Sequence, residues 1–248
     1  MQRASSRLIL LVAASACLGA GPALAASTQT QAPSVPAPHV HSEGATTLLV
    51  ENKLPWGTDS NERVLADLGV PYDRIGGKDF ASLDLSPYST IILASVQTAH
   101  FYANVGKHMD AIDAWLRHGA RTLEVHAARY SITPPWDFEL PGGVGTRLVL
   151  ADDNYLSGVD SPLVSGLPQH MTGNYASHIV FVGRKPLDDR VLIVTSDKQA
   201  VMVDYCVGPG RVIATGQTVE YGWGHDWDFA QVLPNMLSAS TLTPGCPH

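Results

Sequence analysis

The feature that most constrains the fold is a series of short apolar runs that alternate with helical patterns in the first half of the chain. Runs of this kind occupy residues 46–50 (TTLLV), 90–94 (TIILA) and 121–125. Each run has the length and composition of a strand that is buried on both faces. Strands that are separated by helices pair in parallel, because the chain must return to the same edge of the sheet. The pattern therefore predicts an α/β sheet with parallel strands.

The helical segments of this half are bounded by recognisable start and stop signals. Asp59 or Ser60 is expected to begin a helix that runs to Leu68, after which residues 71–75 form a short strand. A second helix is expected from the apolar spacing of Met109, Ile112, Trp115 and Leu116, and it ends at His118-Gly119.

The second half of the chain shows hairpin signals. The turn signal Gly208-Pro209-Gly210 separates the strand that ends at Tyr205 from a strand over residues 211–215. Residues 216–225 are interpreted as a polar and aromatic loop, and Asp226 or Asp228 as the cap of the last helix. The remaining expected elements are strands over 147–151 and 179–182, a hairpin of 190–195 with 200–205, and a helix over 229–237.

The N-terminus has the pattern of an export signal over residues 1–25. Arg3 and Arg7 precede an apolar run that is too short for a comfortable membrane span, and Ala23-Leu24-Ala25 matches a cleavage site. An alternative is lipidation of Cys17. Residues 26–45 are interpreted as a flexible linker, residues 46–241 as the folded domain and 242–248 as a tail. We therefore expect a secreted or periplasmic protein without a transmembrane span.

The charge balance argues against nucleic acid as a partner. The full chain has a formal net charge of −7, and lysine and arginine form no cluster. The mature chain keeps two cysteines, Cys206 and Cys246. An even pair in an oxidising compartment favours a disulfide, which would fix the C-terminal tail to the hairpin.

Four pieces of sequence together resemble the class I glutamine amidotransferase-like superfamily. They are TTLLVEN, AIDAWLRHGARTLEV, GNYASHIVF and VDYCVGPGRVIATGQTVEYGW. The last two are similar to secreted and polysaccharide-associated members, including the middle domain of some β-galactosidases. The resemblance implies a three-layer, flavodoxin-like, mostly parallel sheet with added antiparallel hairpins.

The resemblance also implies that the hydrolytic chemistry of the family is lost. Catalytic members carry a cysteine on a sharp turn after the strand that matches residues 122–125, and a His and a Glu after the strand that matches 212–215. Here the first turn reads His126-Ala127-Ala128-Arg129. The acid is retained as Glu220, but the thiol and the histidine are missing. Without an activated nucleophile, thiol-dependent amide hydrolysis is not expected.

Polar and aromatic side chains follow the predicted parallel strands, where ligands bind in sheets of this type. Planar polar groups beside aromatic rings suit a sugar or another polar, ring-shaped ligand. An alternative is that these groups close the core and satisfy the backbone at loop turns. The predicted ligand-binding residues are Asn52, Trp56, Gln97, His126, Arg129, Gln217, Glu220, Tyr221 and Trp223.

Catalysis and metal binding remain weaker interpretations. His126 with Glu220 could form an acid–base pair, because a carboxylate tunes a histidine near neutral pH. Asp152 and Asp153 could bind a metal with His170 or His178, but an ordinary turn is favoured there. No cofactor and no metal are predicted.

The sequence thus favours an exported, non-catalytic domain that binds a glycan, a peptide or an envelope protein. A hydrolase that uses His126 and Glu220, or a metal, is one alternative. A structural or assembly domain of the cell envelope is the other.

Overall fold

The structure is a computed structural model, and it describes residues 40–247 apart from 81, 131, 132, 134, 135, 137, 184–186, 188 and 189. The expected signal peptide, Cys17 and most of the expected linker therefore lie outside the described residues. Within the described part of the chain, none of the helices has the length and apolar character that crossing a bilayer requires.

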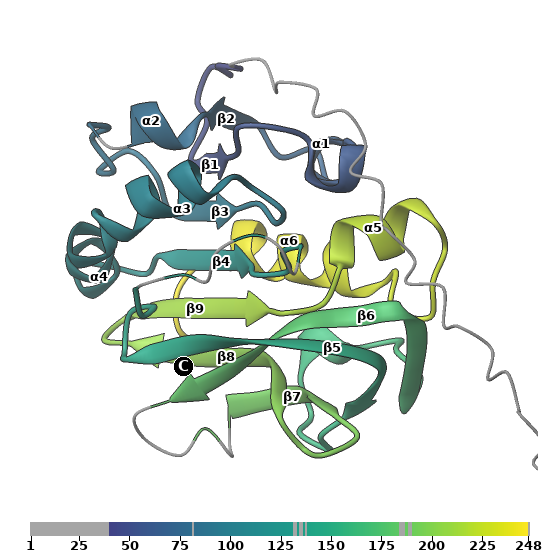
Figure 1. The fold of residues 1–248 in the computed structure, drawn as a ribbon. Helices are drawn as coiled ribbons and strands as arrows, with labels where there is room; N and C mark the ends of the chain where they lie inside the picture. Colours follow the sequence, from purple (N-terminus) through teal and green to yellow (C-terminus); the bar gives the residue numbers. More distant parts are fainter. Residues whose placement is uncertain are drawn as a thin grey trace, which may run out of the picture. The chain divides into compact units, whose positions relative to one another are not determined.

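Five parallel strands form one half of a nine-stranded mixed sheet (Figure 1). Their order is β2-β1-β3-β4-β9, and each neighbouring pair is parallel. The expected parallel pairing of the first strands is confirmed. The bounds are β1 Thr47–Val50, β2 Tyr72–Ile75, β3 Thr90–Leu93, β4 Thr122–His126 and β9 Gly210–Thr215.

Helices cover both faces of this parallel half, because its strands are apolar on both sides. Residues of α2, α3 and α4 pack with Leu48, Ile91 and Leu123 on one face. Residues of α1 and α6 pack with Leu49 and Ile92 on the other. The helices are η1 Pro55–Gly57, α1 Ser60–Asp67, α2 Gly77–Phe80, α3 Ala99–Gly106, α4 Met109–Arg117, η2 Pro162–Val164, α5 Val219–Gly224 and α6 Val232–Leu242.

The other half of the sheet is antiparallel and is larger than the sequence predicts. It consists of β5 Val144–Leu156, β6 His170–Gly183, β7 Val191–Thr195 and β8 Ala200–Val207. The strands follow β9 in the order β8-β6-β5-β7, and β7 pairs again with β8, which closes a small barrel. The expectation of a mostly parallel sheet is therefore corrected to a mixed sheet. The two predicted hairpins, β7–β8 and β8–β9, are confirmed.

Two local predictions after β9 are wrong. The expected loop contains the helix α5, whose Gly222 amide donates to the Thr218 carbonyl. The last helix begins at Val232, and neither Asp226 nor Asp228 caps it. Asp228 instead accepts hydrogen bonds from the amide and hydroxyl of Thr172 on β6. A carboxylate that is bonded across to a strand is not free to cap a helix.

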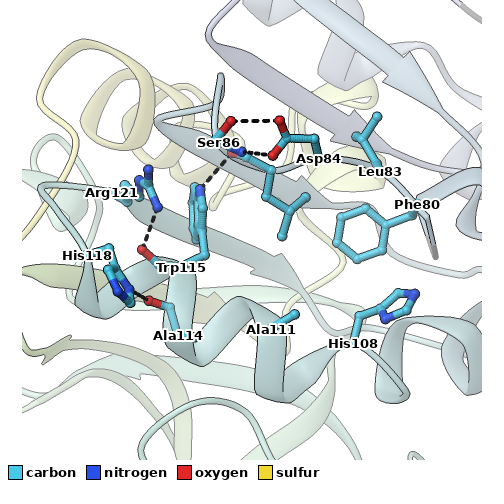
Figure 2. A pocket seen from close by; sticks show the side chains of 11 residues that line it. Phe80, Leu83, Asp84, Ser86, His108, Ala111, Ala114, Trp115, His118 and Arg121 are labelled. Atoms are coloured by element: carbon cyan, nitrogen blue, oxygen red, sulfur yellow. Dashed lines mark hydrogen bonds between the residues drawn. The ribbon is translucent and has the colours of Figure 1, made fainter.

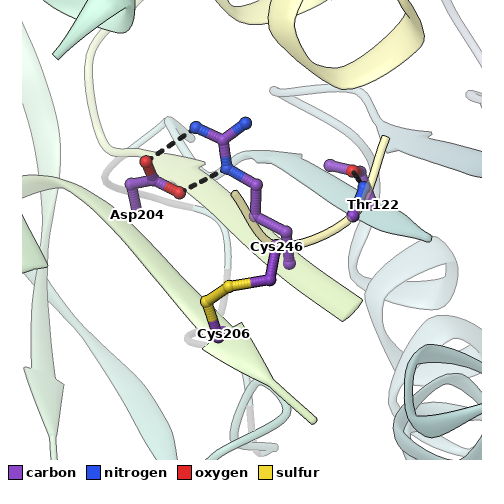
Figure 3. The surroundings of a disulfide bond; sticks show 6 residues. Thr122, Asp204, Cys206 and Cys246 are labelled. Carbon is purple, nitrogen blue, oxygen red and sulfur yellow. Dashed lines mark hydrogen bonds and ion pairs between the residues drawn. A yellow bond between two sulfur atoms is a disulfide. The ribbon is translucent and has the colours of Figure 1, made fainter. Parts of the chain in front are cut away.

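The disulfide between Cys206 and Cys246 is confirmed, with 5.5 Å between the Cα atoms (Figure 3). It joins the end of β8 to the C-terminal tail. The tail is held further by the Gly245 amide, which donates to Thr122 Oγ1, and by the Cys246 amide, which donates to the Pro209 carbonyl. Gly245 has a φ of 91°, and a Cβ at this position would lie 2.7 Å from Ala120. The tail is therefore part of the fold.

Candidate functional site

A buried chain of acidic and basic groups lies at the carboxyl ends of β3, β4 and β9. Glu124 and His126 are two residues apart on β4, so their side chains leave the strand on the same face. His126 Nε2 lies 2.7 Å from Glu124 Oε1, and His126 Nδ1 lies 2.9 Å from Glu220 Oε1 on α5. The Ser95 amide and hydroxyl donate to the two oxygens of Glu220. We call Ser95, Glu124, His126 and Glu220 the buried network.

The electrostatics favour a positively charged His126 between two carboxylates. Burial alone would lower the pKa of His126, but Glu220 and Glu124 raise it to about 10. Burial would raise the pKa of Glu220, but His126 and the Ser95 amide hold it below its usual value. All four side chains of the network are fully buried. The network is therefore an internal ion cluster, and it cannot touch a substrate in this conformation.

The raised pKa of His126 predicts a loss of stability at alkaline pH. The contribution of His126 is complete below its unfolded pKa of 6.5 and is lost as the pH rises toward about 10. In this window the free energy of unfolding should fall by at most about 1.4 kcal/mol per pH unit, because the folded protein holds the proton on His126 and the unfolded chain does not. Urea unfolding between neutral pH and about pH 10 checks this. A shallower slope is expected for His126→Asn, and an identical slope in that variant would contradict the assignment.

Two glutamines that the sequence predicts to bind a ligand are instead buried supports of the site. Gln97 Oε1 accepts hydrogen bonds from the amides of Asn52 and Lys53, and its Nε2 donates to the carbonyls of Lys53 and Ser95. It therefore fixes the loop after β1 to the end of β3. Gln217 donates to Asn154 on β5 and is fully buried. The sequence predicts that Gln217 and Glu220 bind a ligand, but their side chains are fully buried and bonded within the fold, so they support the site instead.

The accessible part of the site is aromatic. Half-buried Trp56 contacts Tyr130 edge-to-face, with 5.0 Å between ring centroids, and also contacts His178 and Tyr221 at 5.3 and 6.1 Å. Tyr221 stacks on the exposed His225 at 3.9 Å. These rings come from the segments that follow β1, β4 and β9. We call Trp56, Tyr130, Tyr221 and His225 the aromatic surface.

Several residues at this edge hold unusual backbone conformations. Trp56, Val96 and Tyr175 have φ values of 55°, 56° and 54°. Such values are uncommon for residues with a side chain, and for β-branched Val96 they are a clear outlier. Strain of this kind concentrates at functional sites, where the surrounding structure maintains it. The aromatic surface is thus held in place by the fold.

The structure brings most of the predicted site residues together, but not all of them. Trp223 is on α5 and lies under the guanidinium of Arg63, whose carbon is 4.8 Å from the ring centroid. It also packs against the core on the face of the sheet that α1 and α6 cover. Trp223 is therefore apart from the aromatic surface. The sequence interpretation missed Glu124, Ser95, Lys53, Tyr130 and the ring contact of His178.

The candidate metal ligands do not converge. Asp153 pairs with His170 at 2.7 Å, whereas Asp152 accepts from the Tyr175 amide and His178 bonds to the Arg129 carbonyl. Within the described ranges, no group of three or more His, Cys, Asp or Glu is arranged to hold a metal ion. The expected turn at Asp152-Asp153 is wrong, because these residues lie inside β5 at a break in its register.

A cavity of about 330 Å³ lies at the opposite ends of the strands, between α4 and the segment before β3 (Figure 2). Ala111, Ala114 and Trp115 of α4 form one side of it, and Phe80 and Leu83 form another. None of the predicted ligand-binding residues lines this cavity. The aromatic surface and this cavity are therefore separate features.

Comparisons of sequence place the chain near one curated protein. An uncharacterized protein of Clostridium acetobutylicum is 24% identical over 193 residues, which make up 77% of this chain and 20% of the relative. The chain thus spans about a fifth of the length of the curated relative that it matches. No family model matches the chain.

Comparisons of structure show the fold alone. The cytoplasmic protein STM1381 of Salmonella typhimurium LT2 matches with a TM-score of 0.55 at 9% identity, over 79% of this chain and 99% of that one. The exo-beta-1,4-mannosidase Op5Man5 of an Opitutaceae bacterium matches with a TM-score of 0.51 at 14% identity, over 82% of this chain and 37% of the mannosidase. A glutamine amidotransferase of Thermotoga maritima also matches, at 10% identity, 80% and 91% coverage and a TM-score of 0.44.

Proposed function

We propose that this chain is an exported, catalytically silent member of the amidotransferase-like superfamily, and that it binds a carbohydrate on the aromatic surface. The five-stranded parallel half would be its flavodoxin-like scaffold. The resemblance in sequence supports the superfamily, and the disulfide is consistent with an oxidising compartment.

The observation that carries the proposal is the contrast between two layers at the same edge of the sheet. The polar groups that could perform acid–base chemistry are bonded to one another and fully buried in the buried network. The residues Trp56, Tyr130 and Tyr221 are only partly buried. A site whose accessible part is mainly aromatic faces, with its paired acid and base groups buried beneath, is suited to binding more than to hydrolysis.

A carbohydrate fits this surface better than a flat apolar ligand. Aromatic rings stack on the apolar face of a sugar ring, while polar groups at their edges bond to hydroxyls. His225 Nδ1 bonds to the Tyr221 carbonyl, which leaves the other ring nitrogen for a ligand. Asn52 and Lys53 follow β1 in the short segment that leads to Trp56.

Binding is tested by screening the protein on a glycan array and measuring the hits by calorimetry. Tyr130→Ala and Tyr221→Ala are each expected to weaken binding by about 2 kcal/mol, roughly 30-fold in Kd, because each removes an anchoring ring. Tyr155→Ala is the matched control, since its ring stacks on His170 of β6 instead. Equal losses in all three variants, or binding of peptides only, would contradict the proposal. Release of ammonia from glutamine by the wild type would contradict catalytic silence.

A further inference from the structure

Two buried cations beside the aromatic surface have no anionic partner in the described part of the chain. Lys53 is 8% exposed and Arg129 is 4% exposed. Lys53 Nζ lies 5.9 Å from the centroid of Tyr130. One terminal nitrogen of Arg129 donates to the Thr133 carbonyl, and its Nε is buried without a partner. Among the described residues, no carboxylate pairs with either cation.

The other buried arginines of the described chain are neutralised. Arg74 is 6% exposed and bonds to Glu51 and Glu62. Arg211 is 5% exposed and forms a two-bond pair with Asp204, at 2.6 and 2.7 Å. Burying a charge is costly unless a counter-charge and hydrogen bonds compensate it. The fold therefore follows this rule at Arg74 and Arg211 and breaks it at Lys53 and Arg129.

Hydrogen bonds and ring contacts join the two cations to the same surface. Gln97 fixes the backbone of Lys53, and Tyr130, under its ammonium group, follows Arg129 in the chain. His178 Nδ1 lies 2.6 Å from the Arg129 carbonyl and its ring contacts Trp56. The indole nitrogen of Trp56 is a further buried donor without a partner. These bonds hold the backbones of Lys53 and Arg129 beside the segments that carry Trp56 and Tyr130, and Lys53 Nζ itself faces the Tyr130 ring.

We propose that the ligand of the aromatic surface is an acidic carbohydrate, whose carboxylate pairs with Lys53 and Arg129 while its ring stacks on Tyr130. This proposal rests on the proposed function. A guanidinium offers a planar pair of donors that matches a carboxylate, and bonds between charged groups are the stronger ones in a site of low exposure. An acidic sugar supplies both the counter-charge that the cations lack and the ring that the aromatic surface accepts.

The test is calorimetric titration with tetragalacturonic acid, with its methyl ester and with sodium acetate. The acid is expected to bind about tenfold or more tightly than the ester, and the difference should shrink as salt is added. Acetate should bind far more weakly than either sugar, because it offers no ring. An ester that binds as tightly as the acid overturns this inference and leaves the proposed function standing. If neither sugar binds while the glycan array gives neutral hits, this inference fails and the proposed function stands; if the array gives no hit either, both fail.

Variants separate the charge from its position. Lys53→Met and Arg129→Met should reduce the preference for the acid over the ester to less than about threefold. Lys53→Arg should keep the preference, and Lys78→Met, on exposed α2, should not change it. Circular dichroism of each variant shows that it is folded, and if the methionine variants do not fold, loss of the preference in a folded Lys53→Arg protein overturns the proposal. Full preference in a folded methionine variant, or a loss in Lys78→Met, overturns the proposal.

Discussion

Replacing His126 with alanine is expected to lower the free energy of unfolding by about 3–5 kcal/mol, because the change leaves two carboxylates buried without a counter-charge. Glu124 and Glu220 are both fully buried and each bonds to the imidazole. In water such groups would keep their hydration, whereas here the protein supplies the only compensation. Chemical denaturation of the wild type and the variant at neutral pH measures the loss.

The matched control and a rescue variant separate charge from packing. His118→Ala removes a histidine from the exposed end of α4 and should change stability by less than about 0.5 kcal/mol. Adding Glu124→Gln and Glu220→Gln to His126→Ala removes the unpaired charges and should recover much of the loss. A His126→Ala protein as stable as His118→Ala would contradict the buried network. If the triple variant is no more stable than His126→Ala, the loss comes from the space left by the imidazole and not from the unpaired charges.

The parallel half of the fold could be predicted because its signal is local. Residues such as Leu48, Ile91 and Leu123 stand in short continuous apolar runs. Runs of this kind are typical of strands that are buried on both faces. The β8–β9 hairpin was equally predictable, because Gly208 supplies the positive φ of 62° that its tight turn requires.

The antiparallel half could not be derived in the same way. The register of β5 shifts twice between Leu148 and Asp153, and each shift moves later side chains to another face. The alternation of polar and apolar residues that marks a strand is therefore interrupted. The β7–β8 hairpin has a local signal, but the pairings of β5 with β7 and of β6 with β8 join residues far apart in the chain, so the barrel closure has no trace in the local pattern.

The position of the candidate site could be predicted from the sequence, but the burial of its polar residues could not. Strand direction tells at which edge of the sheet the site lies. The burial of the site residues depends on which other segments of the chain pass over that edge. Strand β6 passes so close to the end of β9 that a Cβ on Gly216 would lie 1.9 Å from the Ile179 carbonyl oxygen. This crossing brings Ser177 of β6 into a bridge with Gln217, which is fully buried. Glu124 was detectable, because an acid inside an apolar strand two residues before His126 shares its face.

Removing the disulfide is expected to cost between about 3 and 4 kcal/mol of unfolding free energy, because it closes a long loop in the unfolded chain. Cys206 and Cys246 are 40 residues apart, and the enclosed segment includes β9, α5 and α6. The bond therefore restrains the segment that supplies Glu220 to the buried network and Tyr221 to the aromatic surface. Cys206→Ser, measured against the oxidised wild type, gives the loss.

The loss should belong to the bond and not to either sulfur atom. Cys206→Ser, Cys246→Ser and the double variant are expected to be equally unstable, because any one change opens the same loop. A reducing agent should bring the wild type to the same stability and leave the double variant unchanged. A wild type insensitive to reduction would mean that the bond is absent from the isolated protein. If the bond forms but its removal costs nothing, the bonds of Gly245 and Cys246 to Thr122 and Pro209 already hold the tail.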